Sequence, residues 1–467
     1  MKLDPAELQN ISFLQLRNFE KLLGKTITGV STDSRTIREN EVFFALRGET
    51  FDGHKFLAEA FANGCIAAVI ERSTNIEAVK TMPLVIVENT TLAYGELARN
   101  YRLKYSIPVL AIGGSNGKTT TKEMITKVLH TRYNVLSTQG NLNNQIGVPQ
   151  TLFNLEKRHD IAVVEIGTNH PGEIRYLCNM LEPTHGLVTN IGREHLEFFQ
   201  TVGGVAKEEG ELFKNLSSRT GSIAFVNADD KNVLAKSKKV KTKVSYSFRS
   251  KKASVSGKIL ESNESGCVKM TFAAKSAKRG VTVQLPIPGE HNAMNALAAA
   301  AVALTFKVPA ASIKSALEKF TPASKRMETV LVNGITIYND TYNANPDSMI
   351  AALRTLDAAR VDGNKIAVLA DMKELGKSSS AEHARVGKAL TGLKIDYLLT
   401  FGDEAKAIHD KAKIVQKTHF ETKGQLAEFL AELAGPGDAI LVKGSRGMKM
   451  EEVVASLHGR WTDTATA

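Results

Sequence analysis

Three observations predict an α/β protein with several domains. The length of 467 residues corresponds to roughly two to four domains of ordinary size. The stretch Pro108–Thr121 combines an apolar strand, a glycine-rich turn and the start of a helix, which is how a parallel α/β unit begins. Strand and helix patterns alternate again after a polar segment at Thr321–Ser324, so we expect a separate doubly wound domain beyond this linker.

The composition is that of an ordinary globular protein. Hydrophobic residues make up 43% of the chain and charged residues 23%. The N-terminus lacks an apolar signal core, and Ala296–Leu304 is too short and too rich in alanine to span a bilayer. We therefore expect a cytosolic protein without stable membrane insertion. Cys65, Cys178 and Cys267 are scattered without metal-ligand spacing, and we expect them to be reduced.

The formal net charge of +11 raises the question of a nucleic-acid partner. The segment Lys231–Lys258 holds ten Lys or Arg residues and no acidic residue. Only Tyr246 and Phe248 in this segment could stack on bases. A basic flank beside a site for anionic small molecules, or a solvated surface, explains the charge equally well, and we expect no nucleic-acid partner.

The stretch Pro108–Thr121 predicts a nucleotide site. Backbone amides of a glycine-rich turn, with a helix N-terminus behind them, attract anions. Lys118 would neutralise charge on the β- and γ-phosphates, and the Thr119 hydroxyl would ligate magnesium. The general P-loop pattern has a glycine where this chain has Ile112, so the match is to the shortened variant Gly114–Thr119. An ordinary glycine-rich turn between strand and helix is the simpler alternative.

The first 87 residues contain short apolar runs and no phosphate loop. Strands at Glu41–Arg47, Ala67–Ile70 and Leu84–Val87, with a helix at Lys55–Asn63, would form a small α/β unit. Nothing in the periodicity indicates catalysis in this region. The candidates for a binding surface are Ser34, Arg35 and the turn Phe51–His54, which contains Asp52.

Two strands beyond the phosphate loop deliver polar side chains. Asp160–Glu165 ends in a carboxylate, and proteins with a phosphate loop hold magnesium with a carboxylate at such a strand end. A glutamate that caps a turn is the alternative. The strand Leu187–Ile191 delivers His195, which becomes a candidate ligand, although a lone histidine is often structural. The loop Asn141–Pro149 gathers side-chain amides that suit either polar ligands or turn formation.

Two helices complete the central region. The first, Val202–Phe213, carries Lys207. The second, Ala293–Phe306, follows Pro286–Asn292, and its start places Asn292 and Asn295 one turn apart.

The C-terminal third contains four expected strands, each followed by a polar turn. Loops after parallel strands meet at one edge of a sheet, and we expect this edge to face the phosphate site across the linker. The strands are Thr336–Asn339, Lys365–Ala370, Tyr397–Phe401 and Asp438–Val442, and the turns are Asp340–Pro346, Asp371–Gly376, Gly402–Asp403 and Gly444–Gly447.

Taken together, these motifs resemble those of the Mur ligases, the ATP-dependent enzymes that form amide bonds in peptidoglycan assembly. The resemblance extends along essentially the full length of the chain. The residues that carry it are Gly114–Thr120, Asn141–Pro149, Glu165, His195, Lys207, Gly289–Asn295, Lys325, Arg326 and Asp340.

Within the family, three stretches look like the members that add D-alanyl-D-alanine. They are Phe51–His54, Tyr342–Met349 and Leu441–Arg446. The members that add the third amino acid typically have a His-Thr-Pro-Asp type of sequence where this chain has Ala344-Asn-Pro-Asp347, and they usually carry an Asp-Asn-Pro-Arg motif that is absent here. The difference favours addition of the dipeptide.

The resemblance implies three domains. Residues 1–87 would form a small α/β domain that binds the UDP-muramoyl-peptide, and residues 88–322 a central P-loop ATPase domain with a mostly parallel sheet. Residues 323–467 would form a Rossmann-like domain that closes over ATP and the incoming amine. The protein is expected to be a monomer.

The resemblance also implies roles for individual residues. Lys118, Glu165, His195 and Lys207 would be catalytic. Two magnesium ions would be held by Thr119, Glu165, His195 and Lys207, the last as a carbamate formed with carbon dioxide. ATP would contact Gly114, Ser115, Asn116, Gly117, Lys118, Thr119, Thr120, Asn292, Asn295, Arg326 and Asp340. The other substrates would contact Ser34, Arg35, Asp52, His54, Asn141, Asn144, Tyr342, Asn343, Asn345, Ser348, Ser445 and Arg446.

The implied reaction activates a carboxylate, which is a poor acyl donor. ATP would phosphorylate the terminal carboxylate of UDP-N-acetylmuramoyl-tripeptide, and the amine of D-alanyl-D-alanine would attack the acyl phosphate. At roughly 4 Å, unit like charges repel by about 4 kcal/mol at an effective dielectric of 20. Lys118 and two magnesium ions would offset this repulsion.

Three alternatives remain open. Folylpolyglutamate synthase shares the ATPase core but usually has a Gly-Lys-Gly-Ser loop, whereas Thr119 and Thr120 follow Lys118 here. A non-enzymatic P-loop switch would need neither an amine site nor a UDP-sugar site. Lys207 could be an ordinary surface lysine paired with Glu211 one turn later.

Overall fold

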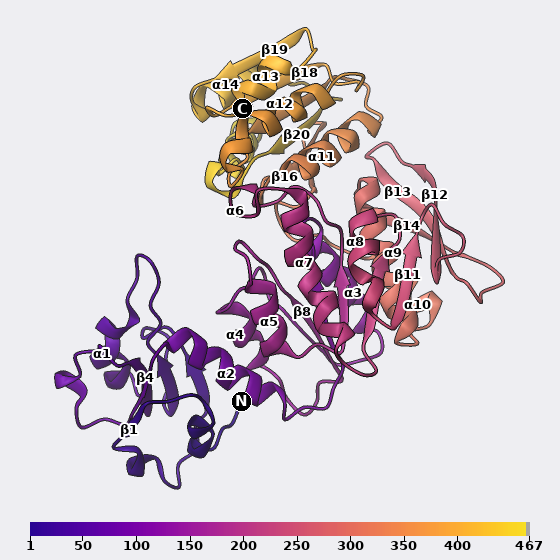
Figure 1. Cartoon of the computed structure of the whole chain (residues 1–467). Helices are drawn as coiled ribbons and strands as arrows, with labels where there is room; N and C mark the ends of the chain where they lie inside the picture. The colour runs from indigo at the N-terminus through magenta and orange to yellow at the C-terminus, as the bar shows by residue number, and fades with distance from the viewer. Residues whose placement is uncertain (464–467) are drawn as a thin grey trace. The chain divides into compact units, whose positions relative to one another are not determined.

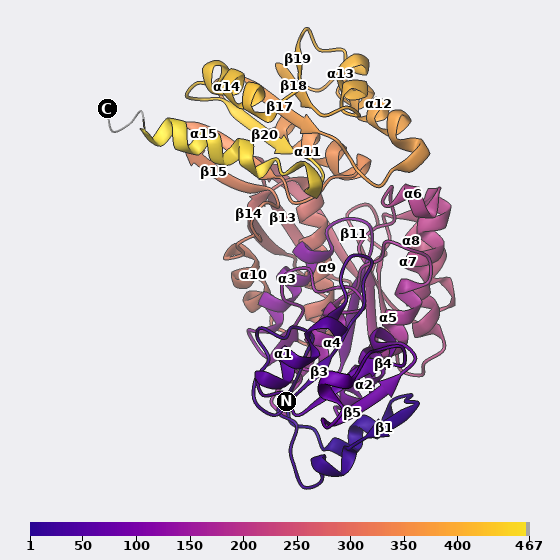
Figure 2. The ribbon, with the colours of Figure 1, turned by 90° about the vertical axis from the view of Figure 1, so that its left-hand side faces the viewer.

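The computed structural model describes residues 1–463, which contain three β-sheets (Figures 1 and 2). The chain divides into two compact units. One comprises Met1–Ala111, Tyr133–Thr168 and Glu173–Thr184, and the other comprises Ile112–Arg132, Asn169–Gly172 and the chain from His185 onward. The mixed, mostly parallel sheets confirm the predicted α/β class.

The N-terminal sheet has five strands in the order β1-β5-β4-β3-β2, with β1 antiparallel and the others parallel. Apolar side chains such as Phe43, Leu57 and Ile70 fill the core beside it. The helix expected at Lys55–Asn63 divides into a 3-10 turn and a short α1, because Asp52 caps the turn at His54. The elements are β1 Gln15–Arg17, β2 Gly29–Ser31, β3 Glu41–Phe44, α1 Leu57–Ala62, β4 Ala67–Glu71 and β5 Leu84–Val87.

The remainder of the first unit contributes to the central sheet. Asn89 caps α2 by accepting a hydrogen bond from the Leu92 amide at 2.9 Å. Strand β8 is buried throughout and ends at Glu165, as the sequence predicts. The elements are α2 Thr90–Arg102, β7 Val135–Ser137, α4 Gly147–Leu152, β8 Ile161–Glu165 and α5 Glu173–Leu181.

The central sheet has nine strands in the order β14-β13-β12-β11-β10-β9-β6-β8-β7. Strands β12, β13 and β14, at one end of this order, are antiparallel neighbours that were not predicted from the sequence. One face of β14 is buried and the other exposed, so its residues alternate in burial. The strands not yet given are β6 Val109–Gly113, β9 His185–Val188, β10 Ile223–Asn227, β11 Thr242–Ser247, β12 Val255–Ser262, β13 Cys267–Ala274 and β14 Val281–Pro288.

Close packing sets the positions of the central helices. A Cβ atom at Gly186 in β9 would lie 2.6 Å from a methyl carbon of Leu216 in α7, so glycine lets this helix approach the strand. The alanine-rich helix α9 packs on α3 and on β10–β13 (Figure 1). The helices are α3 Lys118–Leu129, α6 Leu196–Phe199, α7 Val202–Ser217, α8 Lys231–Lys236, α9 Glu290–Thr305 and α10 Ala310–Glu318.

The C-terminal sheet has six strands in the order β15-β16-β20-β17-β18-β19, and β15 alone is antiparallel to its neighbour. The four expected strands are present. Two further strands were not predicted from the sequence: β15, an edge strand, and β19, whose sequence is mostly polar. The elements are β15 Glu328–Val332, β16 Ile335–Asp340, α11 Pro346–Ala358, β17 Lys365–Ala370, α12 Ser379–Ala389, β18 Tyr397–Phe401, α13 Lys406–Lys411, β19 Gln416–Phe420, α14 Lys423–Leu433, β20 Ala439–Lys443 and α15 Glu451–Asp463.

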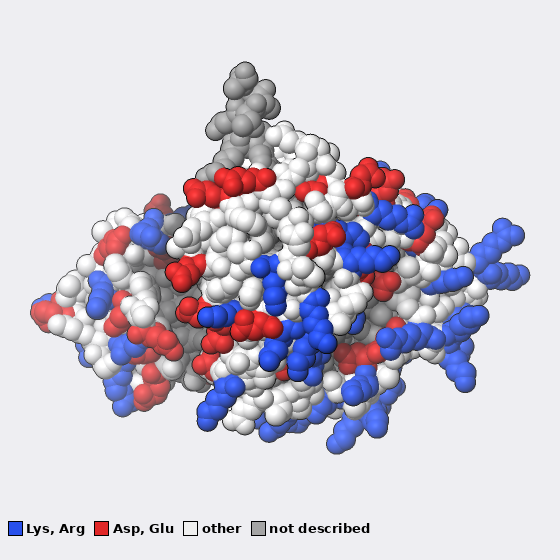
Figure 3. Space-filling view, turned by 90° about the horizontal axis from the view of Figure 1, so that it is seen from above, with Lys and Arg blue, Asp and Glu red and all other residues white. Residues whose placement is uncertain are grey.

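The structure also bears on the cysteines, on membrane-spanning helices and on the basic segment. Cys65, Cys178 and Cys267 are buried thiols without disulfide bonds, as expected. Within residues 1–463, no helix has both the length and the apolar sequence needed to cross a membrane. The lysines of the segment Lys231–Lys258 are exposed, and Lys and Arg gather along the right-hand flank of the surface in Figure 3.

Candidate active site

The turn between β6 and α3 is the glycine-rich loop predicted from the sequence. Gly114 has φ +114° and Gly117 has φ +78°, both in the left-handed region. A Cβ at Gly114 would lie 2.3 Å from Thr189 Oγ1, and one at Gly117 would lie 2.6 Å from Asn295 Oδ1. Ile112 lies within β6, so the turn begins after the position where longer P-loops have glycine. The positive φ and the close contacts therefore require glycine at Gly114 and Gly117.

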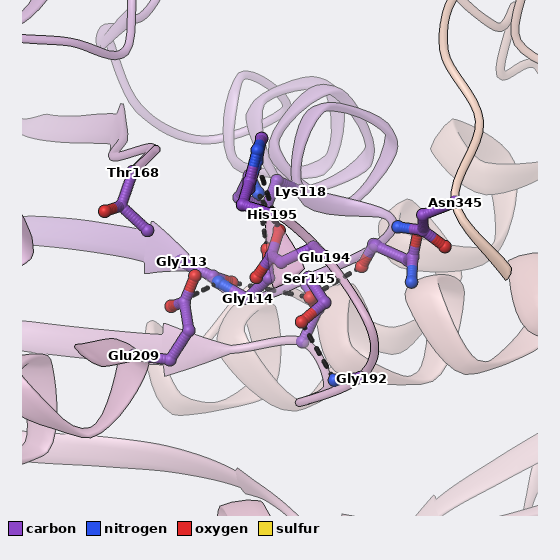
Figure 4. A network of polar contacts seen from close by, with 12 residues as sticks. Gly113, Gly114, Ser115, Lys118, Thr168, Gly192, Glu194, His195, Glu209 and Asn345 are labelled. Carbon is purple, nitrogen blue, oxygen red and sulfur yellow. Dashed lines mark hydrogen bonds and ion pairs between the residues drawn. The ribbon is translucent and has the colours of Figure 1, made fainter. Parts of the chain in front are cut away.

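The segment after β9 holds this loop in place. Asn190 accepts hydrogen bonds from two loop amides, from Ser115 N at its carbonyl (2.9 Å) and from Asn116 N at Oδ1 (3.2 Å). Its Nδ2 donates to the Asn116 carbonyl at 2.9 Å. Gly192 N donates to Ser115 Oγ at 2.9 Å (Figure 4). The sequence predicted β9 to run to Ile191, but it ends at Val188, which frees these residues to bind the loop.

Charged side chains bracket the backbone of Gly114. Its amide donates to Glu209 Oε2 at 2.7 Å, and its carbonyl accepts from Lys118 Nζ at 2.5 Å (Figure 4). Lys118 Nζ also lies 3.5 Å from Glu194 Oε2. Burial, together with the neighbouring Glu194 carboxylate, raises the pKa of Glu209 to about 8. One oxygen each of Glu194 and Glu209 has no hydrogen-bond partner among the described residues.

His195 lies at the N-terminus of α6 and contacts a residue from the C-terminal sheet. Its Nδ1 lies 2.6 Å from Glu374 Oε2, and this contact lowers the pKa of the Glu374 carboxyl. The Glu197 amide donates to the Glu374 carbonyl at 3.0 Å. His195 and Glu374 both have positive φ, 46° and 63°. Strained residues of this kind cluster at functional sites.

Two further contacts join the loops of the C-terminal sheet to the phosphate loop. Asn345 Nδ2 donates to Asn116 Oδ1 at 2.8 Å. Asp347 Oδ2 accepts from the Arg193 amide at 2.7 Å, and a Cβ at Gly192 would lie 2.5 Å from the same oxygen. The carboxyl-end loops of this sheet therefore contact the phosphate loop, as the sequence analysis expected.

Glu165 lies at the end of β8, is buried, and accepts a hydrogen bond at Oε1 from Asn143 Nδ2 at 2.8 Å. Asn143 was not among the predicted site residues, although its neighbours were. Asn141 is exposed, and Asn144 uses Oδ1 to accept the Ile146 and Gly147 amides before α4. Asn144 therefore orders the turn that leads into α4.

Lys207 is exposed on α7, and Glu211 pairs with Lys214 at 3.0 Å. The surface position that the alternative gave Lys207 is confirmed, but Glu211 pairs with Lys214 in its place. The neighbours of Lys207 in the sequence point inward, since Glu208 accepts the Gly172 amide at 2.8 Å and Glu209 holds Gly114.

The predicted adenine-contacting asparagines lie in the first turns of α9, which begins at Glu290, three residues before the expected start. Both are buried, and Asn295 Nδ2 donates to Asn292 Oδ1 at 3.1 Å. Asp340 Oδ2 accepts from the buried Lys443 Nζ at 2.6 Å. The Arg326 guanidinium stacks on the Tyr342 ring at 3.7 Å.

The remaining predicted contacts in the C-terminal part surround the end of β20. Asn343 Oδ1 accepts from the Arg446 amide at 3.3 Å, and the Arg446 guanidinium lies 5.7 Å from the Tyr342 ring. The buried Ser445 donates to the Ala344 carbonyl at 3.3 Å. Ser348 and Asn345 form the capping box of α11, in which Asn345 uses Oδ1, while its Nδ2 bonds to Asn116.

The predicted N-terminal binding residues are divided between surface and core. Arg35 is exposed and pairs with Asp33 at 2.7 Å, which lowers the pKa of Asp33 to about 2. Ser34 is buried. His54 is also buried, with Nδ1 2.6 Å from Asp52 Oδ1 and Nε2 accepting the Glu71 amide at 3.0 Å. The ring nitrogens of His54 therefore serve the fold.

Family models match three successive parts of the chain. A family model described as the Mur ligase family catalytic domain matches residues 26–107, one for the Mur ligase middle domain matches 112–303, and one for the Mur ligase glutamate ligase domain matches 325–446. The chain is 35% identical over 468 residues to UDP-N-acetylmuramoyl-tripeptide--D-alanyl-D-alanine ligase of Haemophilus influenzae, with 98% of each protein covered. The chain belongs to the Mur ligase family.

Solved structures of family members resemble this Mur ligase over most of its length. A crystal structure of MurF from Acinetobacter baumannii matches with a TM-score of 0.89 at 32% identity, covering 98% of this chain and 99% of that one. A MurF ligase from Thermotoga maritima in complex with ADP matches with a TM-score of 0.83 at 29% identity, covering 94% of this chain and 99% of that one.

Several residues around the site of this Mur ligase were not selected from the sequence. Glu194 directly precedes the predicted His195, but the sequence does not distinguish a buried carboxylate there from a surface one. Glu209, Glu374 and Asp347 contact residues that are distant in the chain, and the motif that contains Asp347 does not indicate this contact. The complete set is Asn143, Asn190, Glu194, Glu209, Asp347 and Glu374.

Proposed function

We propose that this Mur ligase joins D-alanyl-D-alanine to UDP-N-acetylmuramoyl-tripeptide at the expense of ATP. The observation that carries the proposal is the glycine loop with Lys118 and the buried Asn292–Asn295 pair beside it. The chain is also similar along its length to a UDP-N-acetylmuramoyl-tripeptide--D-alanyl-D-alanine ligase. The Ala344-Asn-Pro-Asp347 sequence, which looks like that of the dipeptide-adding members, supports the choice of amine.

The phosphate loop has the groups that phosphoryl transfer requires. The amides at the N-terminus of α3 would bind phosphate oxygens, and Asn190, which accepts the Ser115 and Asn116 amides, fixes the loop before them. Lys118 leaves the Gly114 carbonyl to contact the β- and γ-phosphates, where its charge offsets repulsion between the triphosphate and the substrate carboxylate. The tripeptide carboxylate attacks the γ-phosphorus, and ADP leaves. The resulting acyl phosphate is the acyl donor.

The donors near the loop suit a hard cation. The unpartnered oxygens of Glu194 and Glu209 show that buried carboxylate oxygens are available there, and magnesium prefers oxygen ligands. The described residues contain no group of three or more His, Cys, Asp or Glu side chains placed to hold a metal. We propose that Thr119, Glu165, His195 and a carbamylated Lys207 hold two magnesium ions when these are bound. The ions would neutralise charge on the transferred phosphoryl group.

The dipeptide amine would be bound by the carboxyl-end loops of the C-terminal sheet. Tyr342, Asn343, Asn345, Ser445 and Arg446 lie in these loops, and Asn345 reaches the phosphate loop itself. The amine attacks the acyl carbon, phosphate leaves, and one amine proton is lost as the amide forms.

The UDP moiety would be held by residues 1–87 through Arg35 and the Asp52–His54 turn. The central domain would comprise residues 88–322 and the last domain residues 323–467. A cytosolic monomer is part of the same proposal.

Phosphate release over a panel of UDP-muramoyl peptides and amines tests the proposal. With UDP-muramoyl-tripeptide, D-alanyl-D-alanine should support far faster release than lysine, diaminopimelate or glutamate. A free amino acid that outperforms the dipeptide would assign the chain to another activity of the family. Turnover of folate substrates would favour the folylpolyglutamate alternative, and nucleotide hydrolysis without any amine product would favour a switch.

A further inference from the structure

Asp371 occupies the first position after β17, at the carboxyl end of the C-terminal sheet, and is almost completely buried. Its Oδ1 accepts two backbone hydrogen bonds from the loop after β18, from Glu404 N at 3.1 Å and from Ala405 N at 2.8 Å. Gly402 in that loop has φ +106°, and a Cβ there would lie 2.4 Å from the same oxygen. One carboxylate therefore fixes the conformation of the Gly402–Ala405 segment.

The same residue joins the loops after two other strands. The Asp371 carbonyl accepts the Ser445 amide, after β20, at 3.0 Å. Lys373 N donates to Ser445 Oγ at 2.8 Å, and Ser445 Oγ donates to the Ala344 carbonyl, after β16, at 3.3 Å. The loops after β16, β17, β18 and β20 thus form one hydrogen-bonded network around Asp371.

This edge of the sheet is where the amine has to bind. Attack on an acyl phosphate requires reacting atoms about 3–3.5 Å apart. The contact between Asn345 and Asn116 places the carboxyl-end loops, and not those at the opposite edge, against the phosphate loop. A loop whose backbone is displaced by a fraction of an ångström would bind the amine in an unproductive position.

We propose that Asp371 is a positioning residue of the amine-acceptor site, acting through the Gly402–Ala405 loop. This role of Asp371 rests on the proposed ligase function, and it adds a residue on which recognition of the amine depends. Asp371 need not contact the substrate, because its two oxygens are used by loop amides and by Lys373 Nζ, which lies 2.9 Å from Oδ2.

The chain offers a matched control. Asp438 lies immediately before β20, a parallel neighbour of β17, and so at the opposite edge of the same sheet. It is equally buried and also accepts two backbone amides, from Asn364 at 2.6 Å and from Gly435 at 2.9 Å. A Cβ at Gly363 would lie 2.2 Å from its Oδ1. Asp438 therefore has the structural role of Asp371 without its proximity to the phosphate loop.

The experiment compares Asp371→Ala with Asp438→Ala in the full chain. Asp371→Ala should raise the KM for D-alanyl-D-alanine about tenfold or more and leave the Kd for ADP unchanged. Both alanine variants should lower the thermal midpoint of unfolding by a similar amount. Asp438→Ala should do so without changing the KM for the amine. Amide hydrogen exchange at Glu404 and Ala405 should become faster in Asp371→Ala alone, and Asp371→Asn, which keeps an acceptor oxygen, should restore part of the loss.

Equal changes of amine KM in the two alanine variants, or an unchanged amine KM in Asp371→Ala, would overturn the proposal. If Asp371→Ala does not fold, Gly402→Ala, which pushes a Cβ into the carboxylate, is measured by the same criteria. The wild-type amine panel is run first. If another amine is preferred, the proposed substrate is wrong, and the role of Asp371 is then judged from the KM of that amine; if no amine is used, both proposals fail.

Discussion

The carboxylate of Glu209 accepts the amide hydrogen of Gly114 at 2.7 Å, across 95 residues of sequence. This bond holds the first glycine of the phosphate loop on one side, and Lys118 binds the carbonyl of the same glycine on the other. The loop conformation therefore depends on α7 as well as on its own glycines.

We predict that Glu209→Ala weakens both folding and nucleotide binding. The variant leaves a buried amide without an acceptor, which costs about 1–3 kcal/mol in the free energy of unfolding. Glu209→Gln keeps an acceptor oxygen and should cost less. Urea unfolding and calorimetric titration with ADP measure the two effects. Glu211→Ala, which removes the surface pair with Lys214 on the same helix, is the control and should cost about 0–1 kcal/mol; equal losses in both alanine variants would contradict the prediction.

Lys118→Ala should abolish turnover without unfolding the chain. The side chain contributes charge that is needed mostly in the transition state, so kcat should fall by about 10²–10³-fold or more. Steady-state kinetics and a thermal melt are the measurements. Lys127→Ala, which removes a half-buried lysine of the same helix that donates to the Lys319 carbonyl, is the control and is expected to retain full activity. Near-normal ligase activity in a folded Lys118→Ala protein would rule out the proposed nucleotide site.

Lys207 is expected to react with carbon dioxide. A carbamate is an anion with two oxygens, which suits a hard cation, whereas an ammonium group would repel one. Lys207→Ala should be nearly inactive and partly rescued by acetate. Labelling with ¹³C-bicarbonate should give a carbamate carbon signal in the wild type that is absent from the variant. Full activity of Lys207→Ala without added carboxylate would show that this exposed lysine has no catalytic part.

Burial lowers the pKa of His185, at the start of β9, to about 4. The unfolded chain, with a histidine pKa of about 6.5, binds a proton between these values that the native chain does not. This contribution to stability is therefore complete above pH 6.5 and is lost as the pH falls toward 4. In His185→Phe, which keeps an aromatic ring against Phe306, the free energy of unfolding should change less between pH 7 and pH 5. The exposed His130→Gln variant should retain the wild-type difference, and an unaltered difference in His185→Phe would refute the assignment.

Sequence patterns correctly predicted the elements whose structure depends on residues close together in the chain. The phosphate loop and the carboxylate at Glu165 were found because an apolar run, glycines and a helical start lie together in the chain. The expected edge of the C-terminal sheet followed from the rule that loops after parallel strands meet on one side.

Long-range contacts and polar strands could not be predicted in the same way. Asp347 had been noted as part of a motif, but its hydrogen bond to the Arg193 amide spans 154 residues. His54 is buried, and both of its ring nitrogens are hydrogen-bonded within the fold. The spacing of apolar residues along the chain does not predict this burial. Strand β19 was missed because its polar sequence packs at the edge of a sheet, where half-buried residues suffice.

Transfer of oxygen from the tripeptide carboxylate to phosphate tests the central claim most directly. UDP-muramoyl-tripeptide labelled with ¹⁸O in its terminal carboxylate is incubated with ATP, magnesium and D-alanyl-D-alanine, and both products are analysed by mass spectrometry. An acyl-phosphate route predicts one ¹⁸O atom in each phosphate released, together with a UDP-muramoyl product extended by the dipeptide. Unlabelled phosphate, or the absence of a UDP-muramoyl product extended by the dipeptide, would contradict the account.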